Sequence, residues 1–306
     1  MSKLYKVQTR LMFHANIKVK IPANYDDDIF NELYGVLEEV DRNYNSYSEN
    51  SYIDRINKNN GNFTDVNDET IEILEKVIYY SDKLNGEYDI TIMPLIKLWG
   101  FYKKSPQGIP SKEEIEKVRK NVNYKNIELD KENRKVRIGK GQEIITGSFM
   151  KSYAVDKMCK KMKEMGITDA IVNAGGSSIV ALNDDENREW GIIVEGEKED
   201  LFDINISNES YSTSDQFNIY LEINGEKYGH ILSAKTGYPS QNRQIGIITE
   251  SAFVGDVLST GLYNQSPKNF LDIVKDLSSE MKIEGFLMDK NGKIFYSEGF
   301  SNYIEK

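Results

Sequence analysis

The apolar positions of the chain follow two periods, and together they predict strands interleaved with helices. Residues 11–21 alternate between apolar and polar side chains, which predicts a strand starting near Met12. In residues 29–40 and 68–84 the apolar side chains recur every three or four positions, which predicts two amphipathic helices. The aspartates at 26–28 precede the first of these helices, and we expect them to cap it.

The remaining pattern predicts short elements separated by turn residues. Residues 41–61 are polar and rich in Asn, Ser and Tyr, which is typical of a surface loop. Pro94 excludes a central strand from 87–95, because proline cannot donate a hydrogen bond to a sheet. The further elements expected are a helix at 111–122 begun by a capping box of Ser111 and Glu114, a hairpin at 126–139, a helix at 149–165, strands at 170–173, 179–182 and 190–194, a helix begun by Pro267, and a final hairpin at 285–297.

Residues 211–263 concentrate polar groups at the ends of predicted elements. A polar turn at 212–215 precedes an alternating strand at 219–223. The Asn-Gly dipeptide at 224–225 is typical of a tight hairpin turn. The return strand leads to His230, one of two histidines in the chain.

A further strand in this stretch, at 245–249, leads to a helix that carries Asp256 and Thr260. Because the two residues are four apart, their side-chain oxygens lie on the same face of the helix. Carboxylate and hydroxyl oxygens suit Mg²⁺, but such a pair is more often structural, and a metal site needs two more oxygens from elsewhere. The stretch alone indicates a site of unknown kind; together with the residues of the next paragraph, composition and spacing indicate a phosphate or nucleotide site.

Other residues fit the same chemistry, and each also has a structural explanation. Gly175 and Gly176 follow a predicted strand and suit close approach of a phosphate to the backbone, but a strand-to-strand turn is the favoured explanation when they are taken alone. Lys151 lies in the first turn of a helix, where free backbone N–H groups bind anions. A lysine at such a position is also commonly just solvated. His230 is a candidate general base or a satisfied polar residue. Tyr47 could stack on an aromatic ligand or cover a loop.

Composition narrows the classes of function. The net charge of the 306 residues is −10 and there is no basic patch, which argues against nucleic acid as a partner. An acidic chain repels phosphates, so a nucleotide ligand needs a metal ion or local lysine and amide donors. The single cysteine, Cys159, allows no disulfide within the chain, and we expect it to be a small buried hydrophobic residue.

No internal repeat, low-complexity tract or linker divides the chain. We therefore expect one α+β domain over residues 1–306, with a helical lobe before residue 140. We expect no membrane span, because the apolar runs are too short, and no run of signal-peptide length occurs at the start. As given, the chain is expected to be cytoplasmic, and extracytoplasmic only if a leader has been removed; it lacks the lipidated cysteine of an exported lipoprotein.

Taken in order along the chain, these motifs resemble those of the ApbE family of FAD:protein FMN transferases. The likeness extends from Met12 to the final hairpin. The motifs that carry it are NSY at 45–47 with SYI at 51–53, GEYDIT at 86–91 with LWGF at 98–101, KSYAVD at 151–156, NAGG at 173–176, STS at 212–214, HI at 230–231 with KTGYP at 235–239, and GDVLST at 255–260.

The resemblance implies an α+β enzyme with a T-fold-like core that binds Mg²⁺ and takes FAD as its substrate. Such enzymes cleave the pyrophosphate of FAD, attach FMN through a phosphoester to a Ser or Thr hydroxyl of a target flavoprotein, and release AMP. An acceptor flavoprotein is therefore the implied partner. The metal and a lysine would also explain how an acidic protein binds a dianionic ligand.

The resemblance also implies roles for individual residues. The flavin-binding set comprises Met12 and Tyr47 beside the isoalloxazine ring, Glu87, Tyr88 and Asp89 on the flavin or adenosine parts, Lys151, Gly175 and Gly176 at the pyrophosphate, and Thr213 and Ile231. Mg²⁺ would be held by the side chains of Asp256 and Thr260 and by the backbone carbonyl near Ser148. His230 would activate the acceptor hydroxyl, with Lys151 as the second catalytic residue.

The chain departs from the usual family pattern within several of these motifs. The differences are Phe13-His14 in place of Gly-Thr, Ile145-Thr146-Gly147-Ser148 in place of Asp-Leu-Gly-Gly, Ser152 in place of Gly, Asp215 in place of Gly, Ala234 in place of Pro, and Gly255 in place of Ala. They leave two alternatives open besides the transferase. One is a Mg²⁺-dependent FAD pyrophosphatase that yields FMN and AMP, and the other is a flavin-binding protein without catalysis.

Overall fold

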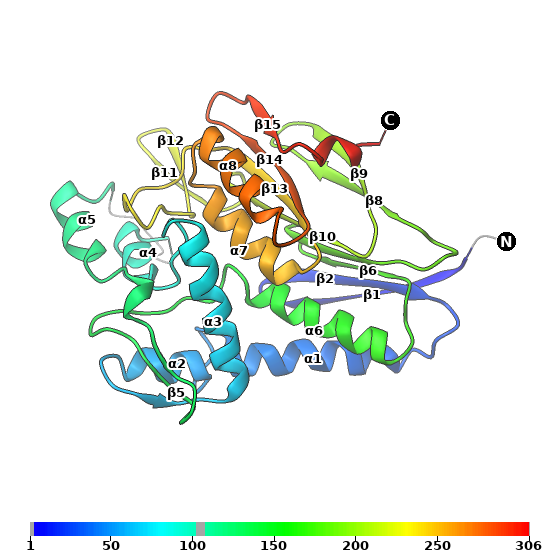
Figure 1. Ribbon diagram of the computed structural model, residues 1–306, viewed down its shortest axis with the longest axis horizontal. Helices are drawn as coiled ribbons and strands as arrows, with labels where there is room; N and C mark the ends of the chain where they lie inside the picture. Colours follow the sequence, from blue (N-terminus) through cyan, green and yellow to red (C-terminus); the bar gives the residue numbers. More distant parts are fainter. Residues whose placement is uncertain (1–2, 102–107, 306) are drawn as a thin grey trace.

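The centre of the fold is an eight-stranded sheet in which every neighbouring pair of strands is antiparallel (Figure 1). The computed structural model describes residues 3–101 and 108–305. The strands, in their order across the sheet, are β1 (Tyr5–Met12), β2 (Ala15–Pro22), β6 (Ala170–Ala174), β7 (Ser178–Leu182), β10 (Ser210–Asp215), β13 (Gln244–Thr249), β14 (Ile283–Met288) and β15 (Ile294–Tyr296).

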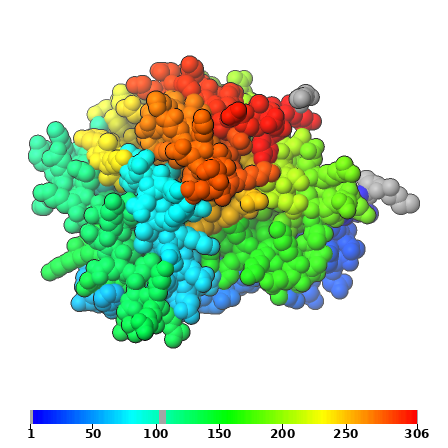
Figure 2. All heavy atoms as spheres, viewed as in Figure 1, coloured from blue at the N-terminus to red at the C-terminus, as the bar shows by residue number. Residues whose placement is uncertain are grey.

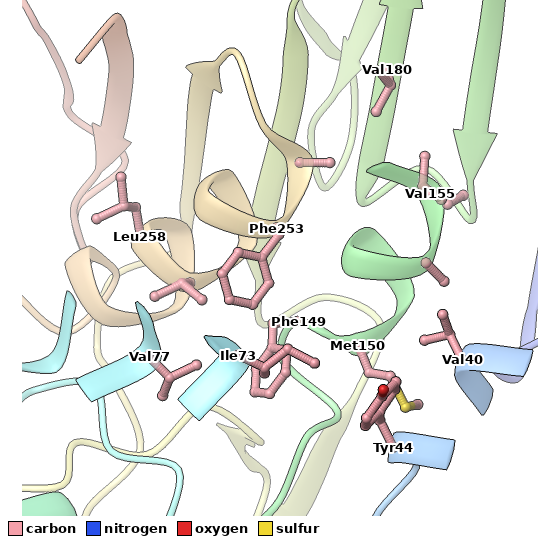
Figure 3. Close-up of a cluster of buried hydrophobic side chains, with 14 of the residues drawn as sticks. Val40, Tyr44, Ile73, Val77, Phe149, Met150, Val155, Val180, Phe253 and Leu258 are labelled. Atoms are coloured by element: carbon pink, nitrogen blue, oxygen red, sulfur yellow. The ribbon is translucent and has the colours of Figure 1, made fainter. Parts of the chain in front are cut away.

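One face of this sheet is covered by helices. They are α1 (Ile29–Tyr44), α6 (Met150–Glu164), α7 (Ala252–Leu262) and α8 (Pro267–Leu277). The main hydrophobic core lies between these helices and the sheet, and Figure 3 shows Phe149 and Phe253 at its centre. The two rings meet edge to face with centroids 5.4 Å apart, which joins the start of α6 to the start of α7.

A hairpin covers the opposite face of the sheet. Its strands are β8 (Trp190–Glu195) and β9 (Asp200–Ile206), and the short helix η2 (Phe300–Asn302) packs beside it. Strand β7 contributes side chains to the hydrophobic cores on both faces of the sheet. Val180 belongs to the helix-side core, whereas Ile179 belongs to the hairpin-side core. Since successive side chains of a strand point to opposite faces, a strand buried on both sides is apolar at consecutive positions.

The remaining elements gather around the ends of α1 and α6 and beside α8. They are α2 (Tyr52–Lys58), α3 (Asp68–Lys83), α4 (Met93–Trp99), α5 (Lys112–Arg119), η1 (Tyr124–Asn126), the small sheet of β3 (Thr64–Asp65), β5 (Lys135–Arg137) and β4 (Glu128–Asp130), and the hairpin of β11 (Tyr220–Ile223) and β12 (Glu226–Gly229). Figure 2 shows α3, in cyan, against the orange segment around α8. Tyr79 and Lys83 of α3 both hydrogen-bond to Glu280 there.

Several expectations from the sequence are confirmed. The hairpins expected at 126–139 and 285–297 and the turn at 224–225 are present, with Asn224 and Gly225 both in the left-handed region. Both halves of the Ser111–Glu114 capping box form at the start of α5. Cys159 is a free thiol buried on α6. Among the described helices, none is both long and apolar enough to cross a membrane.

The strand expected to start near Met12 is wrong in its boundary. Met12 instead ends β1, and the alternating stretch begins again at Ala15 as β2. Phe13 and His14 form the turn between them with φ angles of 51° and 59°. A two-residue hairpin turn commonly requires positive φ at both positions, which Asn and Gly adopt most readily. Because neither residue is of that type, the sequence hides this turn.

The polar turn expected at 212–215 is also wrong, because these residues lie in β10, an interior strand of the sheet. Its buried hydroxyls are satisfied by neighbours across the sheet and on α7. The Ser210 hydroxyl donates to the Thr249 carbonyl over 3.0 Å, and the Ser214 hydroxyl lies 3.1 Å from that of Ser259. Polar composition predicts a turn only when such partners are absent.

Two smaller expectations about the first helices are wrong. The segment expected to be a loop at 41–61 contains α2, whose start is capped by Ser51 accepting from the backbone N–H of Asp54 over 3.0 Å. Asp28 stands at the N-cap of α1 but makes no side-chain capping bond. Asp27 instead pairs with Lys6 of β1 at 2.7 Å, so one of the three acids serves the sheet rather than the helix.

Candidate active site

The helix that carries Asp256 and Thr260 is fixed at its start by a carboxylate from α6. Asp156 accepts hydrogen bonds from the Ser251 hydroxyl at 2.6 Å and from two backbone N–H groups at the start of α7, at 2.9 and 3.0 Å. Burial raises the pKa of Asp156, and these hydrogen bonds oppose that shift. A carboxylate at free helix N–H groups is a strong anchor, so α6 and α7 are held in register.

Asp256 lies one turn into α7 and points toward the first residues of β7. The Ser178 hydroxyl lies 3.0 and 2.9 Å from the two carboxylate oxygens of Asp256. Burial raises the pKa of Asp256, while the positive charge of Lys151 and nearby hydroxyls lower it. The site therefore contains a buried carboxylate with a cation near it.

Lys151 reaches the turn that joins β6 to β7. Its Nζ donates to the Ala174 carbonyl over 2.6 Å and to the Ser177 hydroxyl. Burial lowers the pKa of Lys151, and the charge of Asp256 opposes that shift. The sequence left open whether Lys151 is simply solvated. In the structure its side chain points inward, to the turn between β6 and β7.

Gly175 and Gly176 form this strand-to-strand turn, with φ angles of 71° and 77°. A Cβ on Gly175 would lie 2.7 Å from the Cβ of Ala15 and 3.9 Å from Lys151 Nζ. The turn explanation for the glycine pair is therefore confirmed. The same turn also lies at the Lys151 ammonium, where the backbone is open to close approach.

The hairpin that begins with Met12 lies against the same turn. Met12 is partly buried and pairs with Ala15, and the N–H of Gly175 donates to the Asn16 carbonyl over 3.0 Å. Strands β1 and β2 thereby bring Met12 to the edge of the site.

Tyr47 and Ser148 belong to two loops that meet at Thr146. Ser46, beside Tyr47, donates its backbone N–H to the Thr146 hydroxyl over 3.1 Å. The ring of Tyr47 is 53% exposed. Ser148 follows in the same loop, and its hydroxyl lies 2.9 Å from the Tyr88 hydroxyl. Burial, followed by the charges of Asp256 and Asp89, raises the pKa of Tyr88, so its phenol stays protonated and able to donate.

Glu87 and Asp89 differ in what they offer to a ligand. Glu87 is partly exposed and accepts a hydrogen bond of 2.6 Å from the Ser233 hydroxyl. Asp89 is buried and accepts from the backbone and hydroxyl of Thr91, at 2.8 and 2.7 Å, and from the backbone N–H of Tyr124 at 2.8 Å. Asp89 therefore fixes the local loop, and its role toward a ligand stays a prediction.

His230 ends the β11–β12 hairpin and is partly buried. Its Nδ1 lies 3.2 Å from the Ile219 carbonyl oxygen. Burial lowers the pKa of His230 from its ordinary value of 6.5, while the bond to Ile219 and the charge of Asp215 oppose that shift. Because a carbonyl can only accept, Nδ1 carries the proton in the neutral ring and Nε2 is left as a base.

The side chains of Thr213 and Ile231 both make contacts within the protein. The Thr213 hydroxyl donates to the Ile245 carbonyl over 2.7 Å, and Ile231 is buried. Asn264 connects the loop that follows His230 to α7. Its side-chain amide donates to the Leu232 carbonyl at 3.3 Å and to the Thr260 carbonyl at 3.5 Å. The end of α7 and the His230 loop are therefore tied together.

The oxygen ligands expected from the sequence at Asp256 are of the type that suits a hard cation. Within residues 3–101 and 108–305, no group of three or more His, Cys, Asp or Glu side chains could hold a metal ion. The set expected from the sequence is of another kind, with one carboxylate from Asp256, one hydroxyl from Thr260 and one backbone carbonyl near Ser148. All are oxygen ligands, the type that Mg²⁺ prefers, and a buried carboxylate gains from a cation beside it.

A family model for the ApbE family matches residues 11–284, which is most of the chain. This chain belongs to the ApbE family. Curated relatives named FAD:protein FMN transferase include one from Haemophilus influenzae, 26% identical over 80% of this chain and 74% of that protein. The one from Escherichia coli K12 is 23% identical over 83% of this chain and 76% of that protein.

Solved structures in the family share the fold. The ApbE protein of Thermotoga maritima superposes with a TM-score of 0.90 at 24% identity, over 99% of this chain and all of that one. The flavin transferase ApbE of Vibrio cholerae gives 0.86 at 19% identity, over 99% of this chain and all of that one. The mixed helix and sheet architecture is therefore that of the ApbE structures.

Two departures from the usual ApbE pattern have clear structural consequences. Ile145 is buried in a hydrophobic cluster with Trp99 and Leu232, so its apolar side chain serves packing. Phe13 takes a left-handed conformation where the family usually has Gly, the residue that adopts it without strain.

Ala234 and Lys235 border a cavity of about 420 Å³ next to the site. Arg119 and Lys125 line it as well, together with Asp89. The lining holds three cationic side chains, Arg119, Lys125 and Lys235, and two carboxylates, Asp82 and Asp89, so both signs of charge face the cavity.

The sequence alone assigns no role to several residues that shape this ApbE site, although Asp156 and Ser212 belong to the motifs that carry the family resemblance. They are Asp156, Ser177, Ser178, Ser212 and Asn264. Ser177 and Ser178 directly follow the glycine pair, which was the available signal. Their roles depend on partners far away in the chain, and local pattern does not contain that information.

Proposed function

We propose that this protein is a Mg²⁺-dependent FAD:protein FMN transferase. It cleaves FAD, joins FMN through a phosphoester to a Ser or Thr hydroxyl of an acceptor flavoprotein, and releases AMP. The observation that carries the proposal is that two adjacent residues, Ser177 in the turn and Ser178 at the start of β7, bind the ammonium of Lys151 and the carboxylate of Asp256. We further propose that residues 1–306 form one flavin transferase domain with a T-fold-like core and a helical N-terminal lobe.

In this proposal the FAD molecule extends across the site that these segments surround. Met12 and Tyr47 flank the isoalloxazine ring, and the pyrophosphate lies at the Gly175–Gly176 turn beside Lys151. Glu87 and Tyr88, with Asp89 as the fixed end of their loop, contact the flavin or adenosine parts. Thr213 and Ile231 complete the contacts from the sheet and from the His230 loop. Lysine and backbone N–H groups suit a diphosphate because both donate to its oxygens.

Asp256, Thr260 and the carbonyl near Ser148 would hold Mg²⁺. When bound, the ion neutralises charge on the pyrophosphate and so favours loss of AMP. The buried position of Asp256 supports this role, because a carboxylate in a dry site is stabilised by a cation.

The transfer step uses His230 as the general base. Nε2 accepts the proton of the acceptor hydroxyl while that oxygen bonds to the phosphorus of the FMN part. The bond from this phosphorus to the bridging oxygen breaks, and AMP leaves with the electron pair of that bond. Lys151 stabilises the charge that develops on the phosphoryl oxygens. The tautomer fixed by the Ile219 carbonyl supports the role of His230.

Mass spectrometry of the acceptor tests this function. The protein is incubated with FAD, MgCl₂ and a flavoprotein domain that carries an exposed Ser or Thr, alongside reactions with EDTA and with the His230→Gln variant. We expect a covalent FMN adduct on the acceptor in the complete reaction, none with EDTA, and far less adduct at the same time point with His230→Gln. AMP release without adduct would favour the FAD pyrophosphatase, and FAD binding without any product would favour the flavin-binding protein.

A further inference from the structure

Two carboxylate oxygens of Asp256 share one hydroxyl. The Ser178 Oγ lies 3.0 Å from one and 2.9 Å from the other. Ser178 is fully buried, and Asp256 is 8% exposed. A single hydroxyl within hydrogen-bond distance of both oxygens holds the direction in which the carboxylate points.

Two further buried serines surround the same carboxylate. Ser152 of α6 and Ser212 of β10 lie close enough to Asp256 to lower the pKa of its carboxyl, and each donates its own hydroxyl to a backbone carbonyl. Ser152 reaches the carbonyl of Phe149 at 2.8 Å, and Ser212 reaches that of Ala252 at 3.5 Å. We call Ser152, Ser178 and Ser212 the serine cage. It draws one hydroxyl from α6, one from β7 and one from β10.

Glycine at position 255 makes room for the cage. A Cβ at Gly255 would lie 2.6 Å from the Oγ of Ser212 and 3.1 Å from its Cβ. Real Cβ atoms do not approach a neighbour at 2.6 Å, so an alanine here requires Ser212 to move. The glycine in place of the usual alanine is therefore coupled to the hydroxyl of Ser212.

Ser177, the last residue of the turn, and Ser178, the first residue of β7, each bind one of the two charged groups of the site. Ser177 binds the ammonium of Lys151, and Ser178 binds the carboxylate of Asp256. One short segment, where the turn passes into β7, therefore contacts both charged groups. The orientation of Asp256 thus depends on β7 and not on α7 alone.

We propose that Ser178, supported by Ser152 and Ser212, is a positioning residue that holds the Asp256 carboxylate in the orientation in which it binds a divalent cation. The inference rests on the proposed function for the identity of that cation as Mg²⁺. Groups that hydrogen-bond to a metal ligand orient it before the metal arrives, and their loss typically weakens metal binding about 10- to 100-fold. Ser178 acts through Asp256 and does not touch the reacting atoms.

Titration calorimetry with Mg²⁺ on the FAD-loaded protein tests this role. We compare Ser178→Ala with Ser210→Ala, which removes an equally buried serine hydroxyl from the sheet, one bonded to Thr249 instead of Asp256. We expect the Kd for Mg²⁺ to rise roughly 10-fold or more in Ser178→Ala and to change less than twofold in Ser210→Ala. In transfer assays, the Mg²⁺ concentration for half-maximal rate should rise in parallel, with kcat recovered at saturating Mg²⁺.

Two further variants keep the test decisive. If Ser178→Ala does not fold, Ser212→Ala is used in its place. This change only opens space beside Gly255, so the variant is expected to fold. It should weaken Mg²⁺ binding several-fold. Asp256→Asn should abolish Mg²⁺ binding. Loss of binding in Asp256→Asn with unchanged binding in the serine variants would overturn the positioning role alone. Unchanged binding in Asp256→Asn would overturn the metal site, and with it the proposed function.

Discussion

The Ser233 hydroxyl donates a 2.6 Å hydrogen bond to the Glu87 carboxylate across 146 positions of the chain. The bond joins the loop that follows His230 to the segment between α3 and α4. These two segments carry separate motifs in the sequence, and the site exists as one unit because they meet.

Removing this bond should loosen the His230 loop. For Ser233→Ala we expect the free energy of unfolding to fall by about 1 kcal/mol, the usual worth of such a hydrogen bond, and the KM for FAD to rise several-fold. Urea unfolding and transfer kinetics measure the two effects. Ser279→Ala, which removes an exposed hydroxyl after α8, is the control. An unchanged KM in Ser233→Ala would show that the bond does not shape the FAD site.

The acid side of the pH profile should report His230. Burial lowers its pKa below 6.5, so the ring is neutral at neutral pH and becomes protonated only in more acidic solution. Transfer should therefore be constant above about pH 6.5 on this limb and fall at lower pH, as the folded pKa is passed.

His230→Gln should reduce the transfer rate by roughly 10²- to 10⁴-fold and remove this acid limb from the residual rate. His14→Gln, at the other histidine of the chain, should leave both unchanged. Steady-state rates from pH 5 to 8 make the comparison. An acid limb that persists in His230→Gln would assign the base to another group.

Lys151 should be needed for FAD binding. Its ammonium faces the Gly175–Gly176 turn, so replacing it with methionine removes a charge-assisted donor while it keeps the length of the side chain. We expect Lys151→Met to weaken FAD binding by about 1.5–3 kcal/mol, or roughly 10- to 150-fold. Fluorescence titration of FAD measures this, with Lys160→Met, an exposed lysine of α6, as control. Equal FAD affinity in both variants would place the pyrophosphate elsewhere.

Gly255 and Ser212 should behave as a coupled pair. Gly255→Ala is expected to cost about 1–3 kcal/mol of unfolding free energy, because the new Cβ meets the Ser212 hydroxyl. Adding Ser212→Ala should recover part of that cost, because it removes the 2.6 Å contact between the new Cβ and the Ser212 hydroxyl. The recovery is partial because the contact of the new Cβ with Thr249 Oγ1 at 3.0 Å remains. A double-mutant cycle by urea unfolding gives the coupling. Purely additive effects would contradict the contact.

Periodicity located most of the fold, because helices such as α3 and α8 each bury one apolar face. The failures have two physical origins, and the first is that a polar residue is predicted to be exposed until its partner is known. Ser210 and Ser214 are buried in β10 because Thr249 and Ser259 satisfy their hydroxyls. The turn at Phe13 and His14 was missed because its residues are unusual for positive φ.

The candidate site shows the same division. Lys151, Asp256 and His230 belong to motifs that can be read in sequence, and the structure brings the first two to one turn. Ser178 could not be assigned a role in advance, because its contact with Asp256 crosses 78 positions and depends on how β7 meets α7. The stacking role of Tyr47, which is exposed, stays a prediction. The role of Asp89 toward a ligand also stays a prediction.

The ratio of AMP released to FMN bound covalently to the acceptor tests the central claim most directly. One reaction with FAD, Mg²⁺ and acceptor is quenched at several times, and AMP is measured by chromatography while the adduct is measured by mass spectrometry. A transferase predicts one AMP for each FMN attached, at every time and with both products absent in Asp256→Asn. AMP in large excess over the adduct, or AMP that accumulates equally without acceptor, would contradict the transferase.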